Sequence, residues 1–176
     1  MALSEMSMVK TSFLRCFRKE STDIAVLFVF HLAPSSPPVN VTAVAHSSTT
    51  IRVAWQPVPK KNRNGKIIGY WSITGDTNSS IRQLLDRNEV KEAYDTLGRH
   101  PNGTFTTCWL TLHDKYGHIC GAYIKVDDGK EDEAQNVIFT GLRKFTPYWV
   151  HVGARTSAGY SISSGSIEVK TGEAGR

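Results

Sequence analysis

Alternation of apolar and polar residues in short segments is the feature of this sequence that most constrains its fold. Ile51, Val53 and Trp55, for example, are separated by Arg52 and Ala54. A period of two puts every second side chain on one face of a β-strand. We predict strands at residues 39–43, 51–55, 67–73, 105–112, 137–140, 148–154 and 167–169. Many short strands separated by proline- and glycine-containing turns predict an all-β, antiparallel sandwich.

The two ends of the chain lie outside this pattern. Residues 1–36 form an N-terminal segment whose apolar run, Ile24–Ala33, is shorter than the roughly 20 residues that a bilayer span needs. The run fits an atypical signal sequence, a buried strand or the frayed end of an upstream segment, and no transmembrane helix is predicted in this chain. Pro34–Pro38 marks the boundary to the sandwich, and residues 173–176 form a tail.

The stretch from about residue 75 to residue 120 interrupts the alternation. Its apolar residues recur at helical spacing before Gly98, which predicts a helix over residues 80–97. Tyr123–Val126 then offers a second way to complete the strand that begins at residue 67. We therefore interpret residues 75–120 as an insertion, which is either an excursion that folds or a sequence that does not belong to the folded module.

Ordered blocks of this sequence resemble the fibronectin type III family. The blocks are Pro37–Ala43, Thr49–Pro57, Asn64–Tyr70, Leu142–Gly159 and Ser166–Glu173. The resemblance covers residues 37–74 and 121–172. It implies one immunoglobulin-like antiparallel β-sandwich over residues 37–172, with the insertion inside it. The sequence departs from the family pattern at Ser72, because the family usually places an apolar residue two positions after the tyrosine of the third strand.

The resemblance also implies which residues form the core. Trp55 would pack between the sheets from the second strand, and Tyr70 would face it from the third. Leu142 and Tyr148 fit the tyrosine corner, in which a phenol hydrogen-bonds to upstream backbone. The expected core residues are Trp55, Tyr70, Leu142, Tyr148, Val150 and Val152.

Basic residues are concentrated in one part of the chain. The net charge is +5, and residues 37–74 hold five basic groups and no acidic ones. A single local patch argues against general nucleic-acid binding. The pattern P-K-K-N-R-N at Pro59–Asn64 favours contact with a sulfated glycosaminoglycan, with a solvated loop as the alternative. The predicted heparin-binding residues are Lys60, Lys61, Arg63 and Lys66.

The three cysteines can close at most one disulfide, and Cys108 with Cys120 is the plausible pair. With His113 and His118 they form C-x4-H-x4-H-x-C, which contains metal-competent ligands but fits none of the common zinc spacings. A metal-binding insert is therefore a lesser alternative, and no cofactor is expected. The acidic run at residues 127–133 lacks the spacing of a calcium loop.

Three Asn-x-Ser/Thr triplets, at Asn40, Asn78 and Asn102, are candidate N-glycosylation sites. They favour an extracellular or cell-surface location. Motifs of nucleophilic, metalloprotease or phosphate-loop enzymes are absent from the sequence, and the implied fold normally hosts recognition.

These observations predict a non-enzymatic module that binds other proteins or mediates adhesion. The resemblance implies neighbouring fibronectin type III modules in a longer receptor-type or adhesion protein. The alternative is a structural spacer between binding domains.

Overall fold

The computed structural model describes residues 32–76, 80–97, 105–110 and 118–172, with the backbone alone for residues 80, 94–97 and 105–110. The chain divides into two units, Met1–His31 and Leu32–Arg176, and all described residues lie in the second. Most of the N-terminal apolar run therefore lies outside the described residues. Within the described part, no helix is long and apolar enough to cross a membrane.

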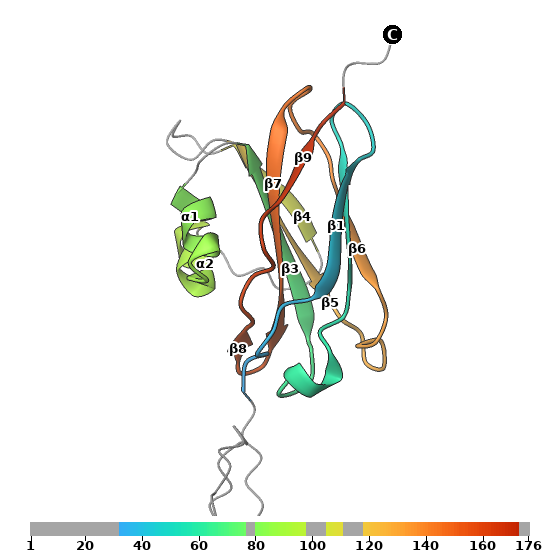
Figure 1. The fold of residues 1–176 in the computed structure, drawn as a ribbon, viewed down its shortest axis with the longest axis vertical. Helices are drawn as coiled ribbons and strands as arrows, with labels where there is room; N and C mark the ends of the chain where they lie inside the picture. The colour runs from blue at the N-terminus through green and yellow to red at the C-terminus, as the bar shows by residue number, and fades with distance from the viewer. Residues whose placement is uncertain (1–31, 77–79, 98–104, 111–117, 173–176) are drawn as a thin grey trace, which may run out of the picture. The chain divides into compact units, whose positions relative to one another are not determined.

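Two antiparallel sheets face each other in the second unit (Figure 1). The first has the order β1-β2-β6 and consists of β1 (Val39–Ala45), β2 (Ile51–Gln56) and β6 (Gln135–Phe139). The second has the order β4-β5-β3-β7-β8, and β9 also pairs with β7. Its strands are β3 (Gly69–Asp76), β4 (Phe105–Leu110), β5 (His118–Lys125), β7 (Pro147–Thr156), β8 (Gly159–Tyr160) and β9 (Ile167–Lys170). The predicted all-β antiparallel sandwich is confirmed.

The space between the sheets is filled by the inner core. In β2 the apolar residues Ile51, Val53 and Trp55 are buried and the residues between them are more exposed, as the alternation requires. The Trp55 and Tyr70 rings lie 5.8 Å apart between centroids at an interplanar angle of 59°. The residues expected in the core all lie in this cluster: Trp55, Tyr70, Leu142, Tyr148, Val150 and Val152.

A tyrosine corner connects β6 to β7. The backbone N–H of Arg143 donates to the Tyr148 hydroxyl at 2.9 Å. The N–H of Leu142 donates to the Thr49 carbonyl at 3.0 Å, which ties this connection to the turn before β2. The phenol thus satisfies backbone that could not join a sheet ladder.

Residues Tyr123–Val126 do not complete the third strand, so this part of the sequence interpretation was wrong. β3 runs without interruption to Asp76, and β5 forms a separate strand antiparallel to it, with Trp71 opposite Tyr123. Because β3 is complete by itself, β5 takes the next position in the sheet.

The segment between β3 and β4 contains two helices where the sequence predicted one over residues 80–97. They are α1 (Ser80–Asp86) and α2 (Val90–Leu97). The break falls at Asn88, which has the left-handed φ of 61°. The N–H groups of Asn88 and Glu89 donate to the carbonyls of Leu85 and Leu84 at 3.0 and 2.8 Å, an arrangement typical of a helix C-terminus.

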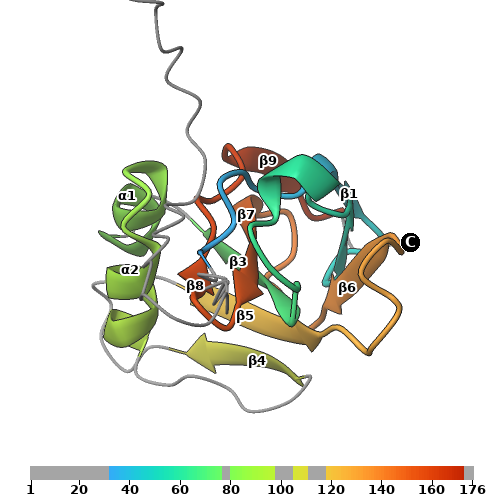
Figure 2. The ribbon, with the colours of Figure 1, turned by 90° about the horizontal axis from the view of Figure 1, so that it is seen from below.

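These helices cover the outer face of the second sheet and give the unit a third layer (Figure 2). We call the apolar cluster between helices and sheet the second core. The strands contribute Trp71, Ile73, Ile119, Tyr123 and Trp149, and the helices contribute Ile81, Leu85, Val90 and Ala93. Consequently, all eight residues of β3 are buried, whereas β2 buries one face.

Two glycines make room for the tryptophans of the second core. Trp71 lies directly opposite Gly153, and Gly75 lies directly opposite Trp149, both in the β3–β7 register. A Cβ atom built on Gly75 would lie 2.5 Å from Cζ2 of Trp149, and one on Gly153 would overlap the Trp71 ring. Each indole therefore lies flat across the neighbouring strand at a position where only glycine fits.

Candidate functional site

The predicted basic loop faces the acidic run across one end of the sandwich. The loop connects β2 to β3 and contains the short 3-10 helix η1 (Lys60–Asn62). Lys60 and Arg63 both contact the Asp132 carboxylate, at 2.8 and 2.7 Å. Lys66 contacts Asp128 at 2.5 Å. We call these five residues the paired-loop surface.

Arg63 is the anchor of the paired-loop surface. Its side chain is 15% exposed, and its Nε donates to the Val58 carbonyl at 2.8 Å. Hydrogen bonds from Lys60 and Arg63 lower the pKa of Asp132, and the hydrogen bond from Lys66 lowers the pKa of Asp128. Exposed ion pairs such as Lys60–Asp132 and Lys66–Asp128 stabilise a fold only slightly. They do, however, reduce the positive charge that this loop presents to a polyanion.

The four residues of the proposed heparin site therefore differ in whether an acidic partner already compensates their positive charge. Three of them contact carboxylates of the acidic run, and within the described part of the chain Lys61 makes no such contact. The acidic run about 65 residues downstream was visible in the sequence. The sequence did not show that the fold pairs this run with the basic loop. Glycosaminoglycan binding at this loop stays a prediction.

The alternative metal site is not assembled by the described residues. Cys120 is disulfide-bonded, and Nδ1 of His118 lies 3.2 Å from the Tyr148 hydroxyl. His113 lies outside the described residues. Among the residues that the structure describes, no three histidine, cysteine or acidic side chains are placed to hold a metal ion. Cys108 stands directly opposite Cys120 in the β4–β5 register, so it remains the predicted disulfide partner.

A buried polar cluster at the other end of the sandwich joins the end of β3 to the start of β5. Asp76, 3% exposed, ends β3, and His118 begins β5. The His118 N–H donates to Asp76 Oδ1 at 2.7 Å, and Nη1 of Arg143 pairs with Oδ2 of the same carboxylate at 2.8 Å. Burial lowers the pKa of His118. The sequence interpretation identified Tyr148, whose hydroxyl contacts His118, as a core residue, and it named His118 only as a candidate metal ligand.

A second buried histidine, His151, lies under α1 and is 1% exposed. Its Nδ1 is 3.0 Å from the Ser164 carbonyl, and its Nε2 is 3.3 Å from Oδ1 of Asp86. Its ring packs edge-on against Trp149, with 5.7 Å between centroids. Burial lowers the pKa of His151, while the Ser164 carbonyl and the Asp86 carboxylate act in the opposite direction. Both buried histidines thus hold structural elements together.

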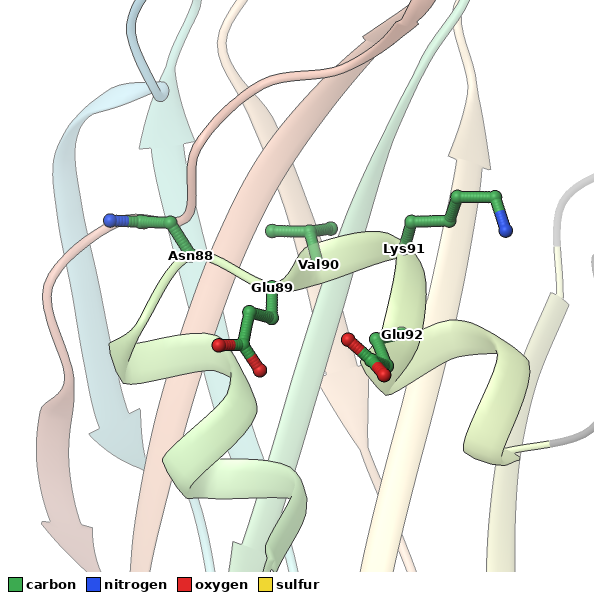
Figure 3. Close-up of a pocket in the computed structure, with 5 residues that line it drawn as sticks. All are labelled: Asn88, Glu89, Val90, Lys91 and Glu92. Atoms are coloured by element: carbon green, nitrogen blue, oxygen red, sulfur yellow. The ribbon is translucent and has the colours of Figure 1, made fainter.

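The turn between α1 and α2 forms a shallow recess of about 320 Å³, lined by residues 88–92 (Figure 3). Asn88 and Lys91 point away from each other, whereas the carboxylates of Glu89 and Glu92 lie on the same side of the turn. Ligand sites are usually built from several elements around an apolar floor. This recess is instead the surface of one turn.

Of the candidate glycosylation sites, Asn40 is exposed and lies in β1 with a left-handed φ of 51°. It falls within an irregularity of the β1–β2 register, between Val39 and Thr42. Asn78 and Asn102 lie outside the described residues.

Comparison with known proteins agrees with this architecture. The sequence matches the Fibronectin type III domain family over residues 36–170. The chain is 31% identical over 140 residues to mouse Receptor-type tyrosine-protein phosphatase F, covering 80% of this chain and 5% of the relative. It is 35% identical over 121 residues to Drosophila melanogaster Cell adhesion molecule Dscam1, covering 66% and 6%. It is 54% identical over 134 residues to chicken Protein sidekick-1, covering 76% and 4%.

The chain therefore spans a small part of the length of these relatives. Among solved structures, the third fibronectin III domain of human KIAA0343 protein aligns with a TM-score of 0.55 and 17% identity. That alignment covers 89% of this chain and 97% of the other, and it supports the fold alone. With the family match over most of the sequence and the two-sheet architecture, the chain belongs to the fibronectin type III domain family.

Proposed function

We propose that this chain is a non-enzymatic interaction module of a longer adhesion or receptor-type protein, where it binds other proteins at the cell surface. The observation that carries the proposal is its match, over most of its length, to small parts of proteins named as a receptor-type phosphatase and a cell adhesion molecule. Neighbouring fibronectin type III modules in the same polypeptide are part of this proposal.

The use of the polar side chains supports a non-catalytic role. Asp76, His118 and His151 are buried and are engaged in contacts that hold strands and helices together. A general base must instead reach a proton on a bound substrate. The carboxylates of Glu89 and Glu92 lie in an open recess on a single turn, and Glu89 is paired with Arg87.

An extracellular location is supported by two features. Cys120 is disulfide-bonded, and disulfides persist mainly in oxidising compartments. Asn40 is exposed at the start of an Asn-x-Thr triplet. On expression through a secretory pathway, we expect glycosidase treatment to reduce the apparent mass of the chain and the Asn40→Gln variant to lose part of that reduction.

The paired-loop surface is the proposed contact region for a protein partner. It presents exposed charges of both signs, such as Lys60 and Asp132. The largely buried Arg63 side chain joins the two loops through its ion pair with Asp132. Charges of both signs at the rim of an interface contribute specificity and association rate more than affinity. The Lys61 ammonium group adds to this surface from the same loop.

The test is binding of the tetramerised full chain to cells, measured by flow cytometry. We expect binding that trypsin treatment of the cells abolishes and that Asp132→Lys reduces several-fold. Arg52→Glu is the matched control, because it also reverses one exposed charge, but in β2, on the outer face of the β1-β2-β6 sheet. Absence of trypsin-sensitive binding, with the fold intact by circular dichroism, would favour the structural spacer. Equal losses for both variants would argue against this surface.

A further inference from the structure

The end of the sandwich opposite the paired-loop surface carries a compact cationic and aromatic group that the sequence patterns did not indicate. It consists of Arg143, Lys144 and Phe145, in the connection from β6 to β7, and Lys170 at the end of β9. We call these four residues the Phe145 pole. In the β3–β7 register, Gly69 lies opposite Arg155 and Asp76 lies opposite Tyr148, so the full length of β3 separates the two ends (Figure 1).

Phe145 is held in an unfavourable conformation without being buried. Its φ is 51°, in the left-handed region, where a bulky side chain is a genuine outlier. Its side chain is nevertheless 55% exposed, so burial in the core does not compensate for this strain. Strained backbone conformations cluster at functional sites such as ligand clamps.

The surrounding contacts fix the ring in place. The Phe145 N–H donates to the Gly172 carbonyl at 3.2 Å, and the Lys170 ammonium lies 3.3 Å from the ring centroid. The buried Thr171 hydroxyl donates to the Arg143 carbonyl at 2.8 Å and accepts from the Thr146 N–H at 2.9 Å. The cations and the ring are therefore pre-organised, which lowers the entropy cost of binding.

The charge of the Phe145 pole is less compensated than that of the paired-loop surface. Arg143 pairs with the buried Asp76 carboxylate, whereas no ion pair of Lys144 or Lys170 with an acidic residue occurs within the described ranges. The nearby Glu168 is paired with Arg82 of α1 at 3.1 Å. At the other end, the carboxylates of Asp128 and Asp132 face the basic loop.

We propose that the Phe145 pole binds a sulfated polysaccharide, with Lys144 and Lys170 contacting the anionic groups and the exposed part of the Phe145 ring packing on a sugar face. A linear polyanion fits this pole because Lys144 and Lys170 are cations without an acidic partner among the described residues, beside a single exposed apolar side chain, Phe145. Stable protein interfaces bury about 800 Å² on each partner around several apolar residues. The inference is independent of protein binding at the paired-loop surface.

The test compares two double variants of the full chain on heparin, each of which removes two exposed lysines. Lys144→Ala with Lys170→Ala changes the Phe145 pole, and Lys60→Ala with Lys61→Ala changes the opposite end. We expect the first to weaken heparin affinity about tenfold and to reduce the slope of log affinity against log salt by about 1–2, because two counterion-releasing contacts are lost. If heparin binds at the Phe145 pole and not at the basic loop, the second should change affinity less than about twofold, because the lysines removed there make no counterion-releasing contact. Equal losses for the two would show a response to net charge and would overturn the assignment.

Phe145→Asn separates the ring from the charges. Asparagine tolerates the left-handed region, so we expect an unchanged or higher melting temperature together with a several-fold loss of heparin affinity at an unchanged salt slope. Full affinity in this variant would remove the ring from the site. Competition by polyglutamate as effective as that by heparin of equal charge would indicate an acidic protein partner and would overturn the polysaccharide proposal.

Discussion

The inner core lies between two hydrogen-bonded sheets, whereas the second core lies between one of those sheets and two short helices. The strands β3 and β7 serve both, with Tyr70 and Tyr148 facing inward and Trp71 and Trp149 facing the helices. Beyond the apolar contacts, α1 is held to the chain between β8 and β9 and to β9 itself, by Ser163–Leu85 at 3.0 Å and Arg82–Glu168 at 3.1 Å. The comparison teaches that one sheet can bury both of its faces, one against a second sheet and the other against a pair of helices.

If the second core is equivalent to the inner one, truncating its central ring should be as damaging as truncating Trp55. We expect Trp55→Ala and Trp149→Ala each to lower the free energy of unfolding by about 3–5 kcal/mol, because both indoles are almost fully buried. Urea denaturation followed by circular dichroism measures this. A cost below about 1 kcal/mol for Trp149→Ala alone would mean that the helical layer contributes little packing.

The glycine–tryptophan pairs allow a finer test of the second core. Gly153→Ala should destabilise the fold by about 1–3 kcal/mol, because the added methyl overlaps the Trp71 ring. Gly165→Ala is the matched control, since a Cβ there meets no atom within 4 Å. Equal thermal shifts for the two variants would contradict close packing of this indole on β7.

In β3, Ser72 faces the inner core and is expected to reduce the stability of the fold. It is 0% exposed, and its hydroxyl has no hydrogen-bond partner among the described residues. Ser72→Ala should therefore increase the free energy of unfolding by about 1 kcal/mol, because an unsatisfied buried hydroxyl is removed. A destabilisation in urea titrations would show that the hydroxyl is satisfied in solution.

The smallest expected effect is the response of the second core to acid. Burial lowers the pKa of His151 in the folded state, so the unfolded chain takes up a proton first as the pH falls below about 6.5. The stability that the neutral ring contributes is complete above that pH and is lost as the pH falls toward the folded pKa. The charged groups facing the ring are Asp86 and Arg82 of α1.

Two substitutions separate this effect from that of His118, whose pKa is lowered in the same direction. The loss of unfolding free energy between pH 7.5 and 5.5 should shrink in His151→Gln. This change in pH dependence should be larger in His151→Gln than in a helix-surface variant such as Gln83→Ala. An unchanged pH dependence in His151→Gln would assign the whole effect to His118 and the carboxylates.

The sequence predicted the inner core well and the second core poorly, for a physical reason. Alternation reveals which side chains of a strand share a face, so Tyr148 and Val150 were assigned correctly to one face and to the core. It does not reveal what covers the opposite face. Trp149 therefore carried no signal of burial, although its glycine partner, Gly75, was visible in the sequence. The helix break was missed because Asn88 resembles an ordinary surface residue until its φ is known.

The candidate sites show the same limit. The basic cluster at residues 60–66 was recognisable from composition, but its neutralisation depends on Asp128 and Asp132, which the fold brings close from far along the chain. Conversely, Phe145 and Lys170 are 25 residues apart and form no motif. Their contact depends on the pairing of β7 with β9, which places Pro147 opposite Lys170.

The hydrogen bond between His118 and Asp76 has a consequence for engineering. A foreign segment grafted between these two residues would start and finish at one point of the scaffold, so added length would cost little in loop-closure entropy. The module could therefore serve as a display platform at this position. The graft would have to bring its own apolar side chains in place of Ile81, Leu85 and Val90, since two indoles would otherwise be left bare to solvent.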